Sequence, residues 1–304
     1  MLELKTILIV AITTSRIFFP GLPVGTEGAP EAAKSFTVEL YSDKKASADA
    51  RAELSVPEGL KLGLGLKLRI GAPEPDHTAD TPTDSTVTYK SYWGCGEPIP
   101  EGQPKLIKID QPGAFPAAPV YPQGSYAYWP DVTKSEPSTE AAIPGIYKLT
   151  TNYAGETSFA IDQRQDFLGG IEIVQPIAKP DLNKAIKIEW KAVPNAVGYL
   201  LTAFGGSLKL SVDWTSSAKP DRTANVDSLP LGSDDIKLLT EDKALIPPEV
   251  TSCTIPAGVF KGCDGAVLTI TAIGKDKVLL RGGFETRIIV RSTLSVPLRV
   301  PSSG

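Results

Sequence analysis

Histidine and cysteine are the residues from which catalytic or zinc-binding sites are most often built, and this chain of 304 residues has one histidine and three cysteines. A Ser/His/Asp or Cys/His system needs an imidazole beside its nucleophile. His77 stands in the Pro-, Asp- and Thr-rich stretch 71–85, which is predicted to be an exposed loop. Cys95, Cys253 and Cys263 lack the close paired spacing of zinc ligands. The sequence therefore predicts no catalytic residue and no metal site.

Carboxylates and glycine-rich stretches offer other chemistry. Two carboxylates suffice for glycoside hydrolysis, and Glu97 is the first candidate, although a solvated turn residue is the plainer interpretation in a chain with 35 acids. Asp76, Asp80 and Asp84 could supply oxygen ligands to calcium, but their spacing fits no calcium-binding loop. The stretch LGLGLK has strand alternation and no helix after it, unlike a phosphate loop. We expect a protein that is not an enzyme and carries no cofactor.

Aromatic side chains form the candidate binding surface of the sequence. Flat exposed rings bind sugars or protein partners by stacking and apolar contact. The alternative is that every second ring fills a core while its neighbours face water. The candidate binding residues are Tyr92, Trp93, Tyr126, Tyr128 and Trp129.

Composition and charge narrow the class of protein. The net charge of −4, with scattered Lys and Arg, gives no positive field for a phosphate backbone, so we expect no nucleic-acid partner. A hydrophobic share of 41% is enough for a folded core. The 27 Gly and 27 Pro residues, among many β-forming residues, predict short strands separated by turns.

Residues 1–33 are predicted to be an export signal, or an apolar N-terminal segment, followed by a linker. The apolar run Ile7 to Ile12 is too short to span a membrane and is followed by Arg16. An export signal is the preferred interpretation, although Glu3 and the lack of a clear cleavage site oppose it. A buried strand is the second interpretation, and pairing with the sheet of a neighbouring subunit is the third.

The cysteines leave two alternatives open. A local disulfide could join Cys253 and Cys263 if their Cα atoms approach within about 7 Å, which would leave Cys95 unpaired. Three buried, reduced thiols are the other possibility.

A first β-sandwich-like domain is predicted over residues 34–166. Phe36, Val38 and Leu40 alternate with polar residues, as a half-buried strand requires. The stretch 43–56 is predicted to return beside it as a hairpin strand, with a short helix as the alternative. Leu60 to Ile70 is predicted to be one strand. Further strands are expected within 86–95, 104–110, 125–131 and 144–162.

The second domain, residues 169–304, contains a family-like pattern in the segment IKIEWKAVPNAVGYLLTA. An alternating strand ends in Trp, and after a short turn the next strand opens with Gly-Tyr. This segment resembles the second and third strands of fibronectin type III domains, at Ile186, Ile188, Trp190, Val193, Pro194, Ala196, Gly198 and Tyr199. The resemblance implies a sandwich with Trp190 and Tyr199 in its core. It also implies that residues 218–248 are an insertion, in which 233–246 is predicted to be helical with Ser233 as its cap.

The sequence as a whole predicts an all-β protein of two β-sandwich-like domains. The string YWGCGEPIPEGQP and the segment around Cys253 resemble a group of secreted proteins of Gram-negative bacteria whose function is not assigned. The predicted function is that of an exported structural, adhesion or filament-forming protein at the cell surface, extracellular or periplasmic. Its expected partners are protein subunits or cell-surface components. The alternative is a protein that binds, or less readily cleaves, polysaccharide.

Overall fold

The structure, a computed structural model, describes residues 6–17, 31–71, 87–107, 121–130, 136–175, 177 and 180–299. Within these ranges the chain is predominantly β-structure and forms an all-β sandwich fold with a single α-helix, α1 (Ser233–Glu241). Short 3-10 turns are η1 (Glu58–Leu60), η2 (Gln163–Gln165) and η3 (Pro220–Arg222).

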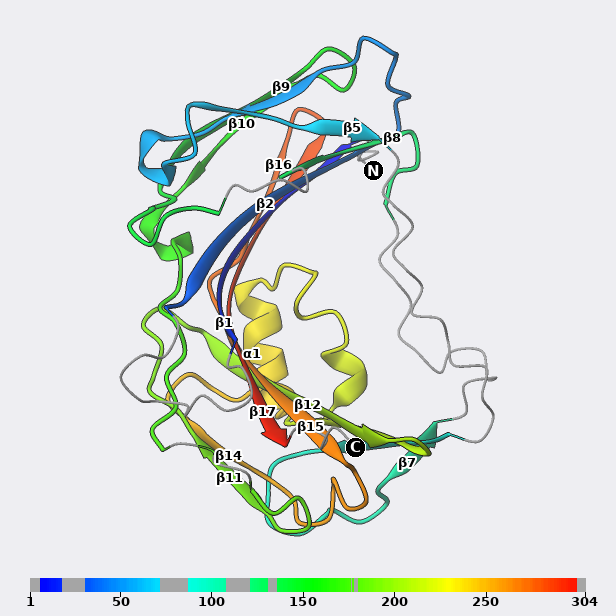
Figure 1. The fold of residues 1–304 in the computed structure, drawn as a ribbon. Coiled ribbons are helices and arrows are strands. Elements are labelled where there is room, and N and C mark those ends of the chain that lie inside the picture. The colour runs from blue at the N-terminus through cyan, green and yellow to red at the C-terminus, as the bar shows by residue number, and fades with distance from the viewer. Residues whose placement is uncertain are drawn as a thin grey trace.

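One large sheet of eleven strands curves through the whole molecule (Figure 1). Strand β16 (Lys277–Arg281) pairs with β17 outside the main strand order. In sheet order, the other strands are β5 (Arg69–Gly71), β8 (Ser125–Trp129), β2 (Ala33–Ser42), β1 (Thr6–Ile17), β17 (Phe284–Arg299), β15 (Gly265–Ile273), β12 (Gly198–Ser207), β13 (Leu210–Thr215), β6 (Thr88–Trp93) and β7 (Lys105–Ile107).

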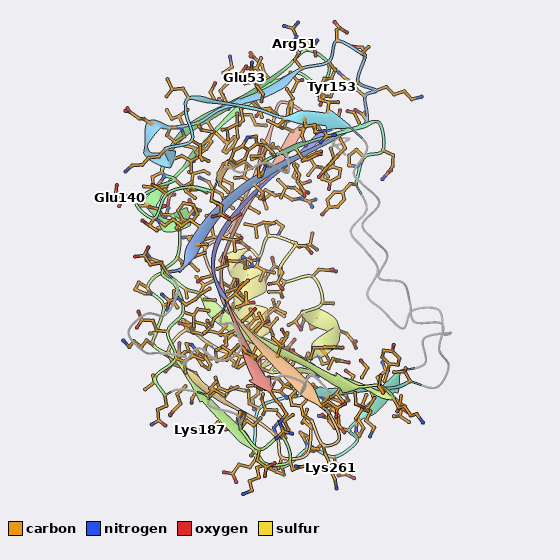
Figure 2. The ribbon with its side chains drawn as sticks, in the orientation of Figure 1. Arg51, Glu53, Glu140, Tyr153, Lys187 and Lys261 are labelled. Atoms are coloured by element: carbon orange, nitrogen blue, oxygen red, sulfur yellow. A yellow bond between two sulfur atoms is a disulfide. The ribbon has the colours of Figure 1, made fainter. Side chains whose placement is uncertain are left out.

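Two smaller sheets cover the same face of the main sheet at its two ends. The four-stranded sheet holds β10 (Glu156–Ile161), β9 (Gly145–Thr151), β3 (Ala52–Ser55) and β4 (Gly65–Lys67). The two-stranded sheet holds β11 (Ile186–Glu189) and β14 (Ser252–Ile255). Figure 2 shows charged residues such as Arg51 and Glu53 at the first end, and Lys187 and Lys261 at the other. One apolar core runs between the layers from end to end.

The main sheet does not divide at the predicted domain boundary between residues 166 and 169. Strands of both predicted domains lie in it, and β6, from the predicted first domain, pairs in parallel with β13 of the second. Strands β1, β2 and β17 run between the two ends (Figure 1). Alternating patterns predict that strands exist but say nothing of their partners, so this sharing could not be read from the sequence.

Two predicted elements of the first half differ from the structure. The stretch 43–56 does not return beside β2, because its strand, β3, pairs with β4 and β9 in the smaller sheet. The single strand predicted for 60–70 is two short strands, β4 and β5, which belong to different sheets. Lys61 and Gly63, with φ values of 57° and 85°, turn the chain before β4 begins, and the two strands separate at Leu68, whose amide donates to the carbonyl of Ala52. Regular alternation therefore did not mean one continuous strand.

The second half contains the predicted short helix and one strand that the sequence did not predict. The N-cap of α1 is Gly232 and not Ser233, with the Asp235 carboxylate accepting a hydrogen bond from the Gly232 amide at 2.9 Å. Leu239 of α1 and Leu245, which follows the helix, are buried. The missed strand is β16, which forms a two-residue hairpin with β17 through Gly282 and Gly283, both at positive φ.

Trp190 and Tyr199 lie in the core between the layers of the second half. They are 1% and 0% exposed, and their rings meet edge to face with centroids 5.2 Å apart. The Tyr199 hydroxyl accepts a hydrogen bond from the Val193 amide at 2.8 Å, which fixes the turn between β11 and β12.

Candidate functional site

Strand β1 is built from the apolar N-terminal run and lies inside the main sheet. All twelve of its residues pair in parallel with β17, from Thr6 opposite Phe284 to Ile17 opposite Ser295. On its other edge it pairs antiparallel with β2, from Thr6 opposite Ser42. The structure thus agrees with the interpretation of this run as a buried strand.

The sequence of β1 explains why it occupies a central position. Leu8, Val10 and Ile12 face the sandwich core with no exposed surface. Ile7 and Ile9, on the opposite face, are each 6% exposed because Ile289 and two tyrosines cover them. A strand that is apolar on both faces is stable only with layers on both sides and neighbours on both edges.

The burial of β1 is large relative to the stability of a folded protein. The five buried aliphatic side chains of β1 are worth roughly 8–15 kcal/mol, at about 1.5–3 kcal/mol each. The whole free energy of unfolding of a domain is only about 5–15 kcal/mol. Removing β1 would also leave the backbone N–H and C=O groups along the facing edges of β2 and β17 without hydrogen-bond partners. The sheet therefore needs a strand in this place, which we call the β1 slot.

A long connection joins β1 to the next strand. Ser15 lies opposite Ala33, so β1 and β2 are neighbours that a hairpin turn of about 2–5 residues could join. The connection between Ile17 and Ala33 is instead residues 18–32, which contain three prolines and three glycines. The length of this connection is therefore not set by the distance between the strands.

The structure does not bring the predicted aromatic binding residues together. Tyr92 and Trp93 lie in β6, whereas Tyr126, Tyr128 and Trp129 lie in β8, near the opposite end of the sheet order. Tyr92 is 6% exposed. Trp129 contacts Phe36 on the core face, with ring centroids 6.2 Å apart. No single aromatic surface results, because β6 pairs with β13 instead of joining the strands around β8.

Tyr126 and Tyr128 belong to a tyrosine cluster on the outer face of the sheet, together with Tyr41 and Tyr121. The rings of Tyr41 and Tyr121 stack with centroids 4.2 Å apart, and those of Tyr126 and Tyr128 with centroids 5.5 Å apart. Burial raises the pKa of Tyr126 to about 12 and raises that of Tyr41, whose hydroxyl donates to Glu39 at 2.9 Å. The rings pack on one another, and two of them, Tyr41 and Tyr121, cover Ile7 and Ile9 of β1, so the cluster belongs to a small second hydrophobic core.

The outer face of the other end of the sheet is more open. Thr202, Thr215 and Thr269 line a shallow hollow of about 270 Å³ beside Phe204 and Asp213. Phe204 is 61% exposed. Burial raises the pKa of Asp213, a rise opposed by the Ser91 hydroxyl, which donates to its carboxylate at 2.7 Å.

Trp93 is the one predicted binding residue beside this hollow. It is opposite Thr215 in the register of β6 and β13, on the face away from buried Tyr92. Its backbone is held by Gln103, whose side-chain amide bonds both the amide and the carbonyl of Trp93, at 2.8 and 2.9 Å.

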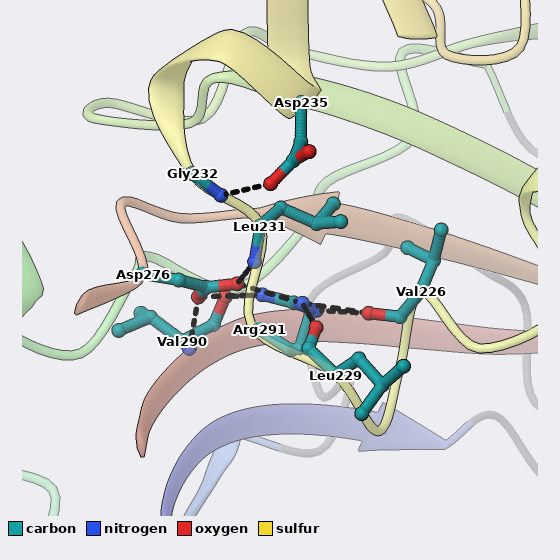
Figure 3. A network of polar contacts seen from close by, with 8 residues as sticks. All are labelled: Val226, Leu229, Leu231, Gly232, Asp235, Asp276, Val290 and Arg291. Atoms are coloured by element: carbon teal, nitrogen blue, oxygen red, sulfur yellow. Dashed lines mark hydrogen bonds and ion pairs between the residues drawn. The ribbon is translucent and has the colours of Figure 1, made fainter. Parts of the chain in front are cut away.

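The segment 218–248, which was predicted to be an insertion, covers the middle of the outer face and is anchored by a buried ion pair (Figure 3). Arg291 of β17 donates to both carboxylate oxygens of Asp276, at 2.8 and 2.9 Å. The same guanidinium donates to the carbonyls of Val226 and Leu229 in segment 218–248. Burial raises the pKa of Asp276, and the Arg291 guanidinium opposes this rise.

The Asp276 carboxylate also replaces a missing strand partner. Strands β15 and β16 follow one another along the same edge of β17, and Asp276 lies in the gap between them. There it accepts a hydrogen bond from the Val290 amide at 2.8 Å and one from the Leu231 amide at 2.9 Å. The pair thus joins three segments, and no local sequence pattern marks it.

The disulfide differs from the predicted one. Cys253 is bonded to Cys95, with Cα atoms 5.5 Å apart, and Cys263 is a buried free thiol. The Gly96 amide donates to the carbonyl of Thr254, which holds the chain after β6 against β14 and brings Cys95 to its partner. The bond therefore ties the main sheet to the two-stranded sheet across 158 positions of sequence.

The remaining candidates for chemistry contribute no site among the described residues. His77, Asp76, Asp80 and Asp84 lie outside them. Glu97 is exposed. The part of the chain that the structure describes has no cluster of His, Cys, Asp or Glu suited to a metal ion, and no helix long and apolar enough to cross a membrane.

Comparisons with family models, with curated proteins and with solved structures find no match to this chain. The resemblance of the second half to fibronectin type III domains stays a prediction.

Proposed function

We propose that this protein is an exported, non-enzymatic structural subunit that assembles with other protein subunits through its main sheet. The observation that carries the proposal is the β1 slot, a place between β2 and β17 that requires an apolar strand. Strand addition of this kind gives strong association because it combines backbone hydrogen bonds with buried side chains. A long curved sheet shared by both halves is a stiff element suited to such a subunit.

The disulfide between Cys95 and Cys253 supports the proposed export, since such bonds persist mainly in oxidising compartments. Export by a signal cleaved after residues 6–17 would remove β1, so the proposal requires these residues in the mature protein. Intact-mass measurement of the exported protein tests this directly, and a mature chain that begins after Ile17 would contradict it.

A second part of the proposal concerns the fold of residues 169–304, which we propose to be fibronectin type III-like. Support comes from Trp190 between the layers, from β11 paired with β14, and from β12 between β13 and β15. Modules of that family commonly act as spacers or docking units, which fits a structural subunit.

Light scattering and negative-stain microscopy of the purified full chain test the assembly. We expect ordered particles much larger than one chain of 32.3 kDa, at a concentration where an unrelated sandwich protein of similar charge stays monomeric. A monodisperse monomer over the accessible concentration range would contradict the proposed function.

Carbohydrate binding is the second candidate, favoured by the exposed Phe204 ring beside the Asp213 carboxylate and several threonine hydroxyls. An apolar ring next to polar groups is the usual arrangement for holding a sugar. Affinity electrophoresis in polysaccharide gels tests it: Phe204→Ala should abolish retardation, and Leu208→Ala, at a 93% exposed position, should not. Equal mobility of wild type with and without polysaccharide would exclude this candidate for the sugars tried.

A further inference from the structure

We infer that, in the assembled form, the β1 slot is filled by residues 6–17 of a second copy of this chain. This inference rests on the proposed function, whose partner it names. In the single chain the slot holds the protein's own β1, and exchange replaces it with the identical segment of a neighbour. Exchange of an identical element is a low-cost route to association, because every contact of the closed form is kept.

The side chains of β1 determine which segment fits the slot. The core face must present large aliphatic groups at three alternate positions, as Leu8, Val10 and Ile12 do. The outer face must present two more beneath the tyrosine cluster, as Ile7 and Ile9 do. A second copy offers this two-faced pattern in the correct register, so the occupant is the same chain and not an unrelated strand.

Polar contacts at both ends of the slot fix the same register. The Thr6 hydroxyl lies 3.3 Å from the Ser42 hydroxyl, and the Thr14 hydroxyl donates to the carbonyl of Leu168 at 2.8 Å. A slip of one residue would break both contacts and turn the aliphatic side chains to the wrong faces. These contacts form equally well whichever copy supplies β1.

The connection to β2 is long enough for exchange. Residues 18–32 can span about 50 Å when extended, at roughly 3.3–3.6 Å per residue. Strand β1 itself is about 40 Å long, at roughly 3.3 Å per residue for twelve residues. The segment can therefore leave one sheet and enter the slot of an adjacent copy. A chain that gives its strand to one neighbour and receives one from another extends without closing, which produces a filament.

Exchange is expected during folding, because withdrawing a central strand from a finished sheet is slow. The test therefore compares chains folded together with chains folded apart. Thr13 and Ser35 are opposite each other on β1 and β2, half-buried and away from the core. Thr13→Cys and Ser35→Cys are made on separate chains in a Cys263→Ala background, which removes the free thiol. The two variants are unfolded in urea without reductant, mixed, refolded and treated with a short thiol crosslinker.

We expect a covalent pair of twice the chain mass after joint refolding, and at least about tenfold less when the variants are folded apart and then mixed, since closed sheets exchange slowly. A mixture of Thr202→Cys and Thr215→Cys is the matched control, because these residues face each other across β12 and β13, which are not exchanged. That mixture should give no covalent pair. Ala11→Cys with Thr37→Cys provides a second pair if the first folds poorly.

The outcomes separate this inference from the proposed function. Large assemblies without covalent pairs in either β1 mixture would overturn the exchange and leave a structural subunit that associates by another surface. Covalent pairs in particles no larger than a closed dimer would support the exchange and contradict the filament. Monomers without covalent pairs would overturn both.

Discussion

Replacing Asp276 by Ala tests the buried ion pair that anchors segment 218–248. The Asp276 side chain has no exposed surface and that of Arg291 is 4% exposed, so neither charge is solvated. Four donors converge on the carboxylate: two guanidinium nitrogens and the amides of Val290 and Leu231. Removing one partner of a buried pair costs about 3–5 kcal/mol, because the remaining charge is left uncompensated.

A loss of this size is about a fifth or more of the stability of a typical domain, which is about 5–15 kcal/mol. Urea unfolding followed by tryptophan fluorescence measures it as a lower midpoint at unchanged slope. Arg291→Ala combined with Asp276→Ala should cost less than the sum of the two single changes, by about 0.5–3 kcal/mol, since contacting residues couple. Limited proteolysis should also cut residues 218–248 sooner in Asp276→Ala.

The surface pair between Lys148 and Glu156 provides the control. Both side chains are more than half exposed, although their charged atoms are 2.9 Å apart. Glu156→Ala should therefore change the free energy of unfolding by less than about 1 kcal/mol. If Asp276→Ala cost no more than Glu156→Ala, the reasoning from burial would be refuted.

Three further predictions follow from the core, the disulfide and the tyrosine cluster. Leu8→Ala should lower the free energy of unfolding in urea by about 2–5 kcal/mol, and the exposed control Leu208→Ala should lower it by less than about 0.5 kcal/mol. Equal losses for the two variants would show that β1 is not in the core. Cys95→Ala should cost about 2–5 kcal/mol by thermal and urea unfolding, and an unchanged midpoint would argue against the bond. Because the pKa of Tyr126 is raised from 10.0 to about 12, the folded form keeps this proton longer than the unfolded chain. The free energy of unfolding should therefore fall as pH rises from about 10 towards 12. In the folded protein, tyrosinate absorbance should show part of the tyrosine titrating above pH 10. A single titration near the ordinary tyrosine pKa of about 10 would contradict the packing of Tyr126.

Much of the secondary structure could be predicted from the sequence, because it depends on local patterns. The alternation of Phe36, Val38 and Leu40 predicted β2, and these three residues do face the core. The stretch 233–246, predicted to be helical, contains α1, which ends five residues earlier at Glu241. The same rules failed at 60–70, where one uninterrupted alternation contains turns at Lys61 and Gly63 and is then divided at Leu68 between two sheets.

The candidate sites were much less accessible from the sequence. Tyr41 meets Tyr126 through the register of β2 and β8, and Tyr121, which precedes β8, stacks on Tyr41. No spacing along the chain predicts these contacts. Only the alternate position of Tyr41 in its strand, on the face away from the core, was a usable signal. The actual disulfide joins cysteines 158 positions apart, whereas the short separation of Cys253 and Cys263 favoured the wrong pair.

By itself, the sequence determined that this protein is an all-β sandwich, since period-two patterning is a property of neighbouring residues. For residues 7–12 it favoured an export signal over the buried strand that the structure contains. Only the tertiary structure decided that one sheet joins both halves, that β1 lies between β2 and β17, and that Asp276 meets Arg291. Strand pairing and buried polar contacts join residues that are far apart in the sequence. They depend on how all the strands pack together, and the residues of a single segment do not determine that packing.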